Sequence, residues 1–411
     1  MLDIKYIRDN MGLVKQNCQN RRVDVDIDEL LRLDDARRAL VAEADGLRSV
    51  RKKTSKTKPS KEEMEKMKGV GENLKKLEDE LNKIEKNYTE LLTRVPNMTH
   101  PDAPVGGEKD FAVLETMGEP TKFDFEPKDH EELMSASDLI DFERGTKVAG
   151  AKFYFVKNDA VRLNQALIAY GIDVVAKHGY ALMETPDMVK QEILDASGFN
   201  PRGQESQIYD IEGHDLHLIG TAEIPLLGYH ANETLDFSDG PKKYAAFSHC
   251  FRTEGGAYGK ANKGLYRVHQ FAKLEMFIFC KPEESEAMHQ ELLAIEKEIL
   301  DGLELPYRVI DIATGDLGGP AYRKYDIEAW MPFLSDYGEI TSASNCTDYQ
   351  ARRLGIKYKK KDGSSELVHT LNGTAIVLTR FPVAIVENYQ QKDGSIAVPK
   401  VLQKYVGKKF I

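Results

Sequence analysis

Residues 251–277 place charged side chains within a stretch whose hydrophobic residues predict a pair of strands. From Arg267 onward, every second residue is charged or aromatic: Arg267, His269, Phe271, Lys273 and Glu275. Because side chains alternate between the two faces of a strand, these five are expected to share one face, with mostly apolar residues on the other. One face of the hairpin is therefore predicted to carry nearly all of its charge.

These residue types suit an anionic ligand with a flat ring. Guanidinium groups bind phosphate oxygens by forked hydrogen bonds, an aromatic ring can stack on a base, and carboxylates can hold an ammonium or Mg2+ bound to phosphate. Arg252 and Glu254, two residues apart upstream, are also expected on one face. A solvent-facing sheet with alternating charges is the alternative. The intervening glycine-rich loop is not a Walker A sequence, and no strand–GxGxxG–helix unit occurs, so a nucleotide would bind on an antiparallel sheet.

Three other segments offer similar polar residues. They supply Thr221 and Glu223 in HLIGTAEIPL, Glu339 and Ser342 in GEITSASNCTDYQARR, and Asn372, Thr374 and Arg380 in HTLNGTAIVLTRF. An arginine at the start of a helix opposes the helix dipole, which favours a ligand-binding role for Arg380. Each segment alone is better explained by surface polarity, but their recurrence favours a single site.

Residues 28–96 have apolar residues at spacings of three, four and seven, the pattern of a coiled-coil seam. The seam comprises Leu33, Leu40, Ala44 and Leu47, and then Met67, Val70, Leu74, Leu77, Leu81, Ile84, Tyr88, Leu91 and Val95. Between the two halves, Pro59 is expected to break the helix and Ser60 to cap the next one. The pattern predicts an antiparallel helical hairpin with arms of roughly 40 Å.

The turn of this hairpin is basic, with Arg48, Arg51, Lys52, Lys53, Lys56, Lys58 and Lys61 around it. A solvated charged face is the ordinary explanation of such a run. A linker rich in Pro and Gly follows Pro96. From about residue 105, short β-branched and aromatic runs alternate with helical windows, which predicts an α+β domain built on an antiparallel sheet.

Composition narrows the class of protein further. The 411 residues are 41% hydrophobic and carry a net charge of -10, so binding of nucleic acid would need a local basic region. No apolar run approaches the ~20 residues of a membrane helix, and the N-terminus has no secretory pattern. Four scattered cysteines form no disulfide framework or zinc motif, so a cytoplasmic location is expected.

Residues 251–277 are similar to motif 2 of the class II aminoacyl-tRNA synthetases, residues 372–391 to motif 3, and ETPDMV around Pro186 to motif 1. The combination of GTAEIPL, RVHQF, SNCTD and TLNG…ENYQQ identifies the chain as a member of the seryl-tRNA synthetases of bacterial type. The resemblance runs end to end. It implies a tRNA-binding domain at 1–100, with the helical arm at about 28–96, and a class II catalytic sheet domain at 101–411.

The resemblance also implies an activity and its residues: ATP-dependent activation of L-serine to seryl-adenylate, then transfer of the seryl group to tRNA(Ser). The implied catalytic residues are Arg252, Arg267 and Glu339. The implied serine-binding residues are Thr221, Ala222, Glu223, Arg252, Glu275, Asn372 and Thr374. The implied ATP-binding residues are Arg252, Thr253, Glu254, Arg267, Val268, Phe271, Glu339, Ile340, Thr341, Ser342 and Arg380. Glu339 and Ser342 would hold Mg2+, and no zinc is expected.

By the same resemblance, the protein is a homodimer with its interface at motif 1, and the arm binds tRNA through Arg48, Arg51, Lys52, Lys53 and Lys56. The motif 2 loop departs from the family pattern, with Ala261, Asn262 and Lys263 in place of an Asp-Thr-Arg triplet. That departure leaves open a paralogue with altered tRNA use or an antibiotic-related role. A catalytically inactive RNA-binding homologue and a ligase that loads serine onto a carrier protein are further alternatives.

The basic tip generates the first prediction. Replacing Arg51, Lys52 and Lys53 together by alanine should raise KM for tRNA, because phosphate contacts supply much of the affinity for nucleic acid. Serine-dependent ATP–pyrophosphate exchange should stay intact, since that step needs no tRNA. Equal losses in aminoacylation and in exchange would count against a separate tRNA-binding role for the tip.

Overall fold

The computed structural model describes residues 1–54, 61–198, 208–254 and 264–411, apart from the side chains of residues 53, 54 and 61–64. The chain divides into two compact units, residues 1–98 and 99–411. Several predicted features lie outside this description: Pro59, Ser60, Lys56 and Lys58, the side chains of Lys53 and Lys61, and the loop residues Ala261, Asn262 and Lys263.

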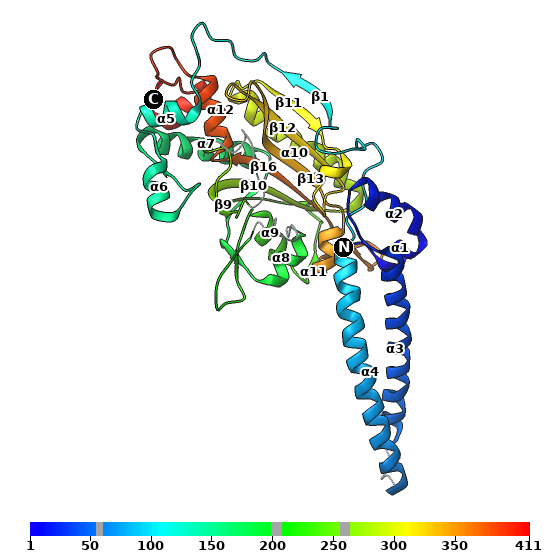
Figure 1. Ribbon diagram of the computed structural model, residues 1–411. Coiled ribbons are helices and arrows are strands. Elements are labelled where there is room, and N and C mark those ends of the chain that lie inside the picture. Colours follow the sequence, from blue (N-terminus) through cyan, green and yellow to red (C-terminus); the bar gives the residue numbers. More distant parts are fainter. Residues whose placement is uncertain (55–60, 199–207, 255–263) are drawn as a thin grey trace. The chain divides into compact units, whose positions relative to one another are not determined.

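The first unit is helical, with α1 at Ile4–Asp9, α2 at Met11–Asn20, α3 at Ile27–Thr54 and α4 at Lys61–Arg94. α3 and α4 lie side by side as a long antiparallel pair (Figure 1). Asp26 begins α3 by accepting the backbone N–H of Glu29 at 2.9 Å. At the base of the pair, the side chains of Asn17 and Arg21 donate to the carbonyl of Asn97. The predicted helical hairpin is confirmed.

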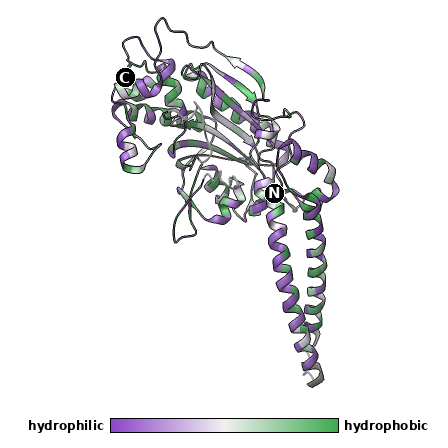
Figure 2. Ribbon diagram, viewed as in Figure 1, coloured by the Kyte–Doolittle hydropathy of each residue, from purple (hydrophilic) through white to green (hydrophobic). Residues whose placement is uncertain are grey.

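The predicted seam is what holds this hairpin together. Every seam residue is buried or half-buried, and Leu33, Ala44, Leu74 and Val95 are buried most completely. Figure 2 shows hydrophilic residues along both helices as well, as expected for two helices with one narrow apolar stripe each. Arg48, one of the predicted tRNA contacts, pairs across the two helices with Glu78 at 2.9 Å and within α3 with Asp45 at 3.0 Å.

The second unit is built on an eight-stranded sheet in the order β1-β11-β12-β13-β16-β10-β9-β4. The strands are β1 Ala112–Met117, β4 Ala181–Glu184, β9 Lys242–Phe251, β10 Gln270–Cys280, β11 Tyr307–Asp311, β12 Arg323–Met331, β13 Asp336–Asn345 and β16 His369–Val377. All neighbours are antiparallel except β4 and β9. The predicted α+β class is therefore confirmed.

Helices cover the sheet on both sides (Figure 1). They are α5 His130–Ala136, α6 Phe142–Ala149, α7 Asn158–Lys177, α8 Gln191–Ser197, α9 Glu223–Tyr229, α10 Ser285–Gly302, α11 Tyr349–Leu354, α12 Arg380–Asn388 and α13 Gln403–Val406. Short strands complete the unit: β2 Ile140–Asp141, β3 Phe155–Val156, β5 Met188–Val189, β6 Tyr209–Asp210, β7 His217–Leu218, β8 Thr234–Leu235, β14 Lys357–Lys359 and β15 Ser365–Leu367. None of the described helices combines the length and hydropathy needed to span a bilayer.

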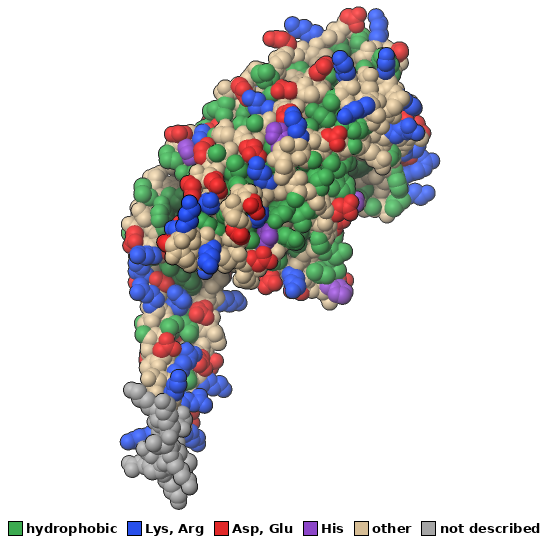
Figure 3. Space-filling model, turned by 180° about the vertical axis from the view of Figure 1, so that it is seen from behind, with side chains coloured by type: hydrophobic (Ala, Val, Ile, Leu, Met, Phe, Trp, Pro, Cys, Tyr) green, Lys and Arg blue, Asp and Glu red, His purple; other side chains and the backbone are tan. Residues whose placement is uncertain are grey.

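α7 and α10 pack on one face of the sheet, here called the back face. Gly171 of α7 lies so close that an added Cβ would meet Ile376 at 2.6 Å and Leu274 at 3.1 Å. Glycine therefore lets α7 approach β10 and β16 closely. In a view turned by 180° from that of Figure 1, the surface of the molecule mixes hydrophobic side chains with scattered charges of both signs (Figure 3).

One local prediction is wrong. Arg267 and His269 were expected within a strand, but β10 begins only at Gln270, and residues 264–269 form turns and bends. The backbone N–H of Leu265 is bonded to a side chain, the imidazole of His130, at 3.2 Å. The last backbone bond toward the upstream segment is at His269, whose carbonyl accepts the Arg252 N–H at 2.9 Å, whereas at Leu265 the backbone N–H bonds a side chain in place of a neighbouring strand.

The hairpin seam generates the second prediction. Leu74→Ala should cost about 2 kcal/mol, at the low end for such a change because the neighbouring seam residues are only half-buried. Amide hydrogens of α3 and α4 should then exchange roughly 30-fold faster. Lys75→Ala, at an exposed neighbouring position, is the control and should leave exchange unchanged. Equal exchange rates in the two variants would show that the seam does not hold the helices together.

Candidate active site

Two irregularities in strand pairing bring the polar residues of the sheet onto the face opposite α7 and α10, the front face. Between β10 and β16, Leu274 pairs with Ile376, but Glu275 pairs with Thr374, which leaves Ala375 as an extra residue. Side chains of paired residues share a face, so this β-bulge moves Thr374 to the front face beside Glu275. Without it, Thr374 would lie on the back face with Ile376.

The second bulge lies between β12 and β13. Ile327 pairs with Thr341 and Glu328 with Glu339, so Ile340 is the extra residue. Glu339 and Ser342 are three residues apart and would occupy opposite faces of a regular strand. The bulge places both on the front face and sends Thr341 to the back.

The front face holds a pocket with about 490 Å³ of empty space, open solvent included. It is lined by Arg252, Glu254, Tyr266, Arg267, Val268, Phe271, Lys273, Glu339, Ile340, Thr374, Val377, Thr379 and Arg380. Its walls come from β10, β13 and β16, from the segments after β9 and before β10, and from the start of α12. Residues far apart in the sequence thus meet around one opening.

Arginines and rings alternate at one end of this pocket. The guanidinium of Arg252 lies 5.3 Å from the centre of the Phe271 ring, and that of Arg380 lies 5.1 Å from the Tyr266 ring. Arg252 also donates through Nε to the carbonyl of Gly220 at 3.2 Å. These are flat, cationic and aromatic surfaces of the kind that stack on a nucleobase and bind phosphate.

Two carboxylates, Glu339 and Glu254, lie among these arginines. Glu339 is paired with Arg380 at 2.7 Å. Burial favours its neutral form, but the charges of Arg380 and Lys324 outweigh burial and hold the pKa of Glu339 well below its usual range. Glu254 lies 3.3 Å from Arg267 and has a backbone φ of +48°, an uncommon conformation for a residue with a side chain. An ionised Glu339 with the Ser342 hydroxyl on the same face suits a hard cation such as Mg2+.

A buried polar network adjoins Lys273 and Thr374, which line the other end of the pocket. The Thr374 hydroxyl donates to Glu275 Oε2 at 3.2 Å, and Lys273 Nζ lies 2.6 Å from the same oxygen. Glu223, at the start of α9, accepts Gln350 Nε2 at 2.7 Å and also a hydrogen bond from Asn372. Five predicted serine residues, Thr221, Glu223, Glu275, Asn372 and Thr374, are each no more than 9% exposed.

The pKa of Glu223 is raised to about 7, mainly because burial penalises its charged form. The hydrogen bond from Gln350 opposes this rise, and the nearby charge of Glu275 adds to it. The two carboxylates of this network therefore differ in role: Glu275 balances a buried cation, whereas Glu223 can donate or accept a hydrogen bond near neutral pH.

The structure brings most predicted ATP residues to one opening, but only Arg252 and Thr374 of the predicted serine residues line it. Thr221, Glu223, Glu275 and Asn372 are buried and do not line it. The predicted ATP residues that line it are Arg252, Glu254, Arg267, Val268, Phe271, Glu339, Ile340 and Arg380. Thr253 and Ser342 do not line it, and Thr341 points to the back face, where its hydroxyl donates to Glu296 at 2.8 Å. Ala222 is buried just before α9.

Sequence reasoning gave no role to Lys273, Tyr266 or Gln350. Lys273 was visible on the charged face of the strand, but its partner Glu275 could be identified only from the geometry. Tyr266 lies beneath Arg380, and its hydroxyl donates to the carbonyl of Glu339 at 3.1 Å. The side chain of Gln350 accepts a hydrogen bond from the Thr370 hydroxyl and donates one to Glu223. These three residues lie in different segments, and the spacing of residues in the sequence does not predict that they meet.

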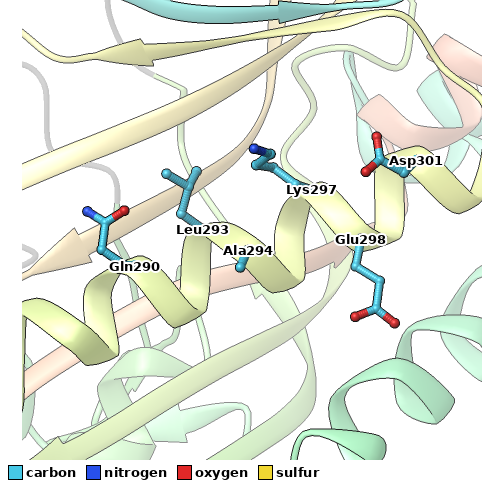
Figure 4. A pocket seen from close by; sticks show the side chains of 6 residues that line it. All are labelled: Gln290, Leu293, Ala294, Lys297, Glu298 and Asp301. Carbon is cyan, nitrogen blue, oxygen red and sulfur yellow. The ribbon is translucent and has the colours of Figure 1, made fainter.

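A second hollow, with about 650 Å³ of empty space, open solvent included, lies on α10 away from these residues. Figure 4 shows its lining, Gln290, Leu293, Ala294, Lys297, Glu298 and Asp301, all from one helix. Lys297 is paired with Glu115, and Glu298 with Lys177 and His178. Since its main charges are paired, this hollow is a poor candidate for a ligand site. Among the described residues, no cluster of three or more His, Cys, Asp or Glu side chains could hold a metal ion.

Comparison with known proteins gives consistent matches along the chain. Residues 1–99 match the family described as "Seryl-tRNA synthetase N-terminal domain", and residues 207–389 match "tRNA synthetase class II core domain (G, H, P, S and T)". The serine–tRNA ligase of Treponema denticola is 52% identical over 99% of both chains. A crystal structure of seryl-tRNA synthetase from Pyrococcus horikoshii complexed with ATP is 39% identical, with a TM-score of 0.90 over 100% of this chain and 99% of that one. A serine–tRNA ligase from Naegleria fowleri in complex with AMP is 34% identical, with a TM-score of 0.86 over 100% and 98%.

Glu223 generates the third prediction. Its folded pKa of about 7 exceeds the ordinary 4.5, so between these pH values the folded protein holds a proton that the unfolded chain has released. Stability should therefore fall as pH rises through this window, by an amount on the order of 3 kcal/mol from this group. Glu223→Gln cannot ionise and should lose that part of the pH dependence.

The measurement is the thermal midpoint of both proteins at about pH 5 and about pH 8. The wild-type midpoint should drop more between the two conditions than that of Glu223→Gln. Comparing two proteins at each pH removes the contribution of other buried acids such as Glu296, whose pKa burial also raises. The same drop in both proteins would contradict the assignment.

Proposed function

The chain belongs to the seryl-tRNA synthetases, and we propose that its second unit activates serine with ATP and transfers the seryl group to tRNA(Ser). Relatives that match it end to end at about half identity are serine–tRNA ligases. The strongest structural support is the front-face pocket, which is lined by Arg252, Phe271, Arg380 and Thr374, with Glu275 bonded to Thr374. An anionic, flat ligand and a small amino acid would meet there.

ATP would lie at the arginine-rich end. The similar P. horikoshii structure holds ATP, and the residues here suit it. Phe271 and Arg380 would enclose the adenine ring, and Glu254 would accept a hydrogen bond from the amino group of that ring. Arg252 would hold the α-phosphate together with the serine carboxylate, and Arg267 the γ-phosphate.

Glu339 and Ser342 would hold Mg2+, because the bulge at Ile340 places an ionised carboxylate and a hydroxyl on one face. Two such groups are too few to bind the ion alone, so phosphate oxygens would have to complete its coordination. Bound in this way, Mg2+ supplies positive charge against the phosphates.

Serine would lie at the buried end. The serine ammonium would bind the carboxylate of Glu275. That carboxylate already balances the charge of Lys273, whose Nζ lies 2.6 Å from Glu275 Oε2. Thr374 and Asn372 lie beside Glu275 and Glu223 and would recognise the hydroxyl. An analogue without the hydroxyl would leave buried polar groups unpaired, so discrimination against it should be strong.

The first step needs no general base, since the serine carboxylate is already ionised. One of its oxygens bonds to the α-phosphorus as the bond to the pyrophosphate oxygen breaks. Arg252 and Arg267 act by positioning the two anions and by offsetting their charge. In the second step a hydroxyl of the terminal ribose of tRNA attacks the seryl carbonyl carbon, and AMP leaves.

The helical arm would bind tRNA by shape and by phosphate contacts. Arg51 and Lys52 are exposed near the end of α3, whereas Arg48 is already engaged by Asp45 and Glu78. All three side chains are exposed, and they are the described members of the proposed tip contacts. Lys53 and Lys56 complete the proposed contact set.

A homodimer is the proposed assembly, with its interface around Pro186. Pro186 lies between β4, the edge strand of the large sheet, and β5. Val161 of α7, Leu182 of β4 and Met188 of β5 are all at least 40% exposed. Exposed apolar residues at a sheet edge favour burial against a second chain. A cytoplasmic location is proposed as well, and the four cysteines, all free and buried thiols, suit a reducing compartment.

The function generates the fourth prediction. The protein should catalyse serine-dependent ATP–pyrophosphate exchange, and Glu275→Gln should lower kcat/KM for serine by about 100-fold, because it leaves the buried Lys273 unpaired and removes the partner of the ammonium. Glu291→Gln breaks the Lys243–Glu291 pair outside the pocket and is the matched control, expected to stay within about twofold. Full activity in Glu275→Gln would disprove the serine site.

The transfer step separates the remaining alternatives. Labelled serine should pass to a tRNA with a long variable arm and far less to one without it. No exchange at all would indicate an inactive RNA-binding homologue. Exchange without charging of any tRNA would indicate a ligase for another acceptor.

A further inference from the structure

We propose that His130, which lies outside the pocket, is a positioning residue for the ATP half of the active site. Its imidazole fixes the backbone at Leu265 and thereby places Tyr266 and Arg267 against the nucleotide. This inference rests on the proposed function, but it concerns a residue that neither the pocket lining nor the motif pattern includes.

His130 is fully buried at the start of α5, and its polar atoms all have defined partners. Nδ1 lies 2.7 Å from Oε1 of Glu387, and the backbone N–H of His130 donates to the same oxygen at 3.0 Å. The other oxygen of Glu387 accepts the backbone N–H of Phe333 at 2.9 Å. Glu387 belongs to α12, the helix that begins at Arg380.

These partners determine the tautomer of the ring. The backbone N–H of Leu265 points at Nε2 of His130 at 3.2 Å, and a backbone N–H can only donate. Nε2 must therefore carry no proton, so Nδ1 carries it and donates to Glu387. Glu387 thus sets the tautomer that lets His130 accept Leu265.

The approach of the two segments is close. A Cβ on Gly264 would lie 2.1 Å from Nε2 of His130, and Gly264 has a backbone φ of +57°. Both facts call for glycine at this position. The segment before β10 is thus fitted against the imidazole and does not merely pass near it.

Tyr266 and Arg267, the two residues that follow Leu265, line the nucleotide end of the pocket. Tyr266 supports the Arg380 guanidinium with its ring and donates to the Glu339 carbonyl, and Arg267 reaches Glu254. Residues 264–268 precede β10 and lack the strand pairing that holds Phe271 and Lys273 in place, while the carbonyl of the adjoining His269 accepts the Arg252 N–H at 2.9 Å. Their position therefore depends on individual contacts, among which the Leu265–His130 bond adjoins Tyr266.

The test measures KM for each substrate in pyrophosphate exchange. His130→Leu keeps an apolar side chain of similar size but removes the acceptor for Leu265. It should raise KM for ATP about tenfold and leave KM for serine within about twofold, because the buried N–H of Leu265 loses its partner on the ATP side only. His130→Gln can accept this N–H through its amide oxygen and should recover most of the affinity for ATP.

Met134→Ala is the matched control, since Met134 is buried on the same helix and in the same core but touches neither Leu265 nor Glu387 through a hydrogen bond. It should lower the thermal midpoint without changing either KM. Equal rises in both KM values for His130→Leu, or a loss of stability with KM for ATP unchanged, would overturn the proposal.

Two further measurements cover the remaining outcomes. If His130→Leu does not fold, Glu387→Gln replaces it. The amide has one accepting oxygen where the carboxylate has two, against three N–H donors, the Phe333 backbone and the backbone and ring of His130, so KM for ATP should rise again. If the wild type shows no serine-dependent exchange, the proposed function fails, and His130 is then tested by calorimetric binding of ATP alone. Equal ATP affinity in the wild type and in His130→Leu would reject the positioning role independently.

Discussion

Charged side chains on the front face of the eight-stranded sheet are partly or wholly removed from water and have to be balanced by opposite charges, and the second unit is arranged around this requirement. Lys273 balances Glu275, Arg380 balances Glu339, and Arg267 balances Glu254. Removing such groups from water costs several kcal/mol per ion, and their attraction returns that cost only in part. Pairs of this kind add little to stability, so their concentration in one pocket is better explained by ligands that exchange partners with them.

The two β-bulges turn this set of charges into a site. In a regular sheet Glu339 and Ser342 would point to opposite faces, and Thr374 would point away from Glu275. One extra residue on β13 and one on β16 bring all four to the front face. The same bulges send Thr341 to the back face, where it meets the buried carboxyl of Glu296. The site therefore depends on the hydrogen-bond register of the sheet as much as on residue identity.

The sequence allowed the helical hairpin to be predicted almost completely, because a seam at spacings of three and four is a local pattern that needs no tertiary contact. It also showed that Phe271, Lys273 and Glu275 share a face. The strand start was wrong, since Leu265 is held by His130, 135 positions away in the chain. The bulges, the Lys273–Glu275 pair and the contact between His130 and Glu387 all depend on long-range register, which periodicity does not encode.

The most direct measurement of the central claim is a crystal structure with a non-hydrolysable seryl-adenylate analogue, such as the sulfamoyl compound. The account predicts its adenine ring between Phe271 and Arg380, its phosphate mimic at Arg252, and its ammonium at Glu275 in place of or beside Lys273. An analogue bound elsewhere, or bound while Glu275 and Thr374 contact none of its atoms, would contradict the account.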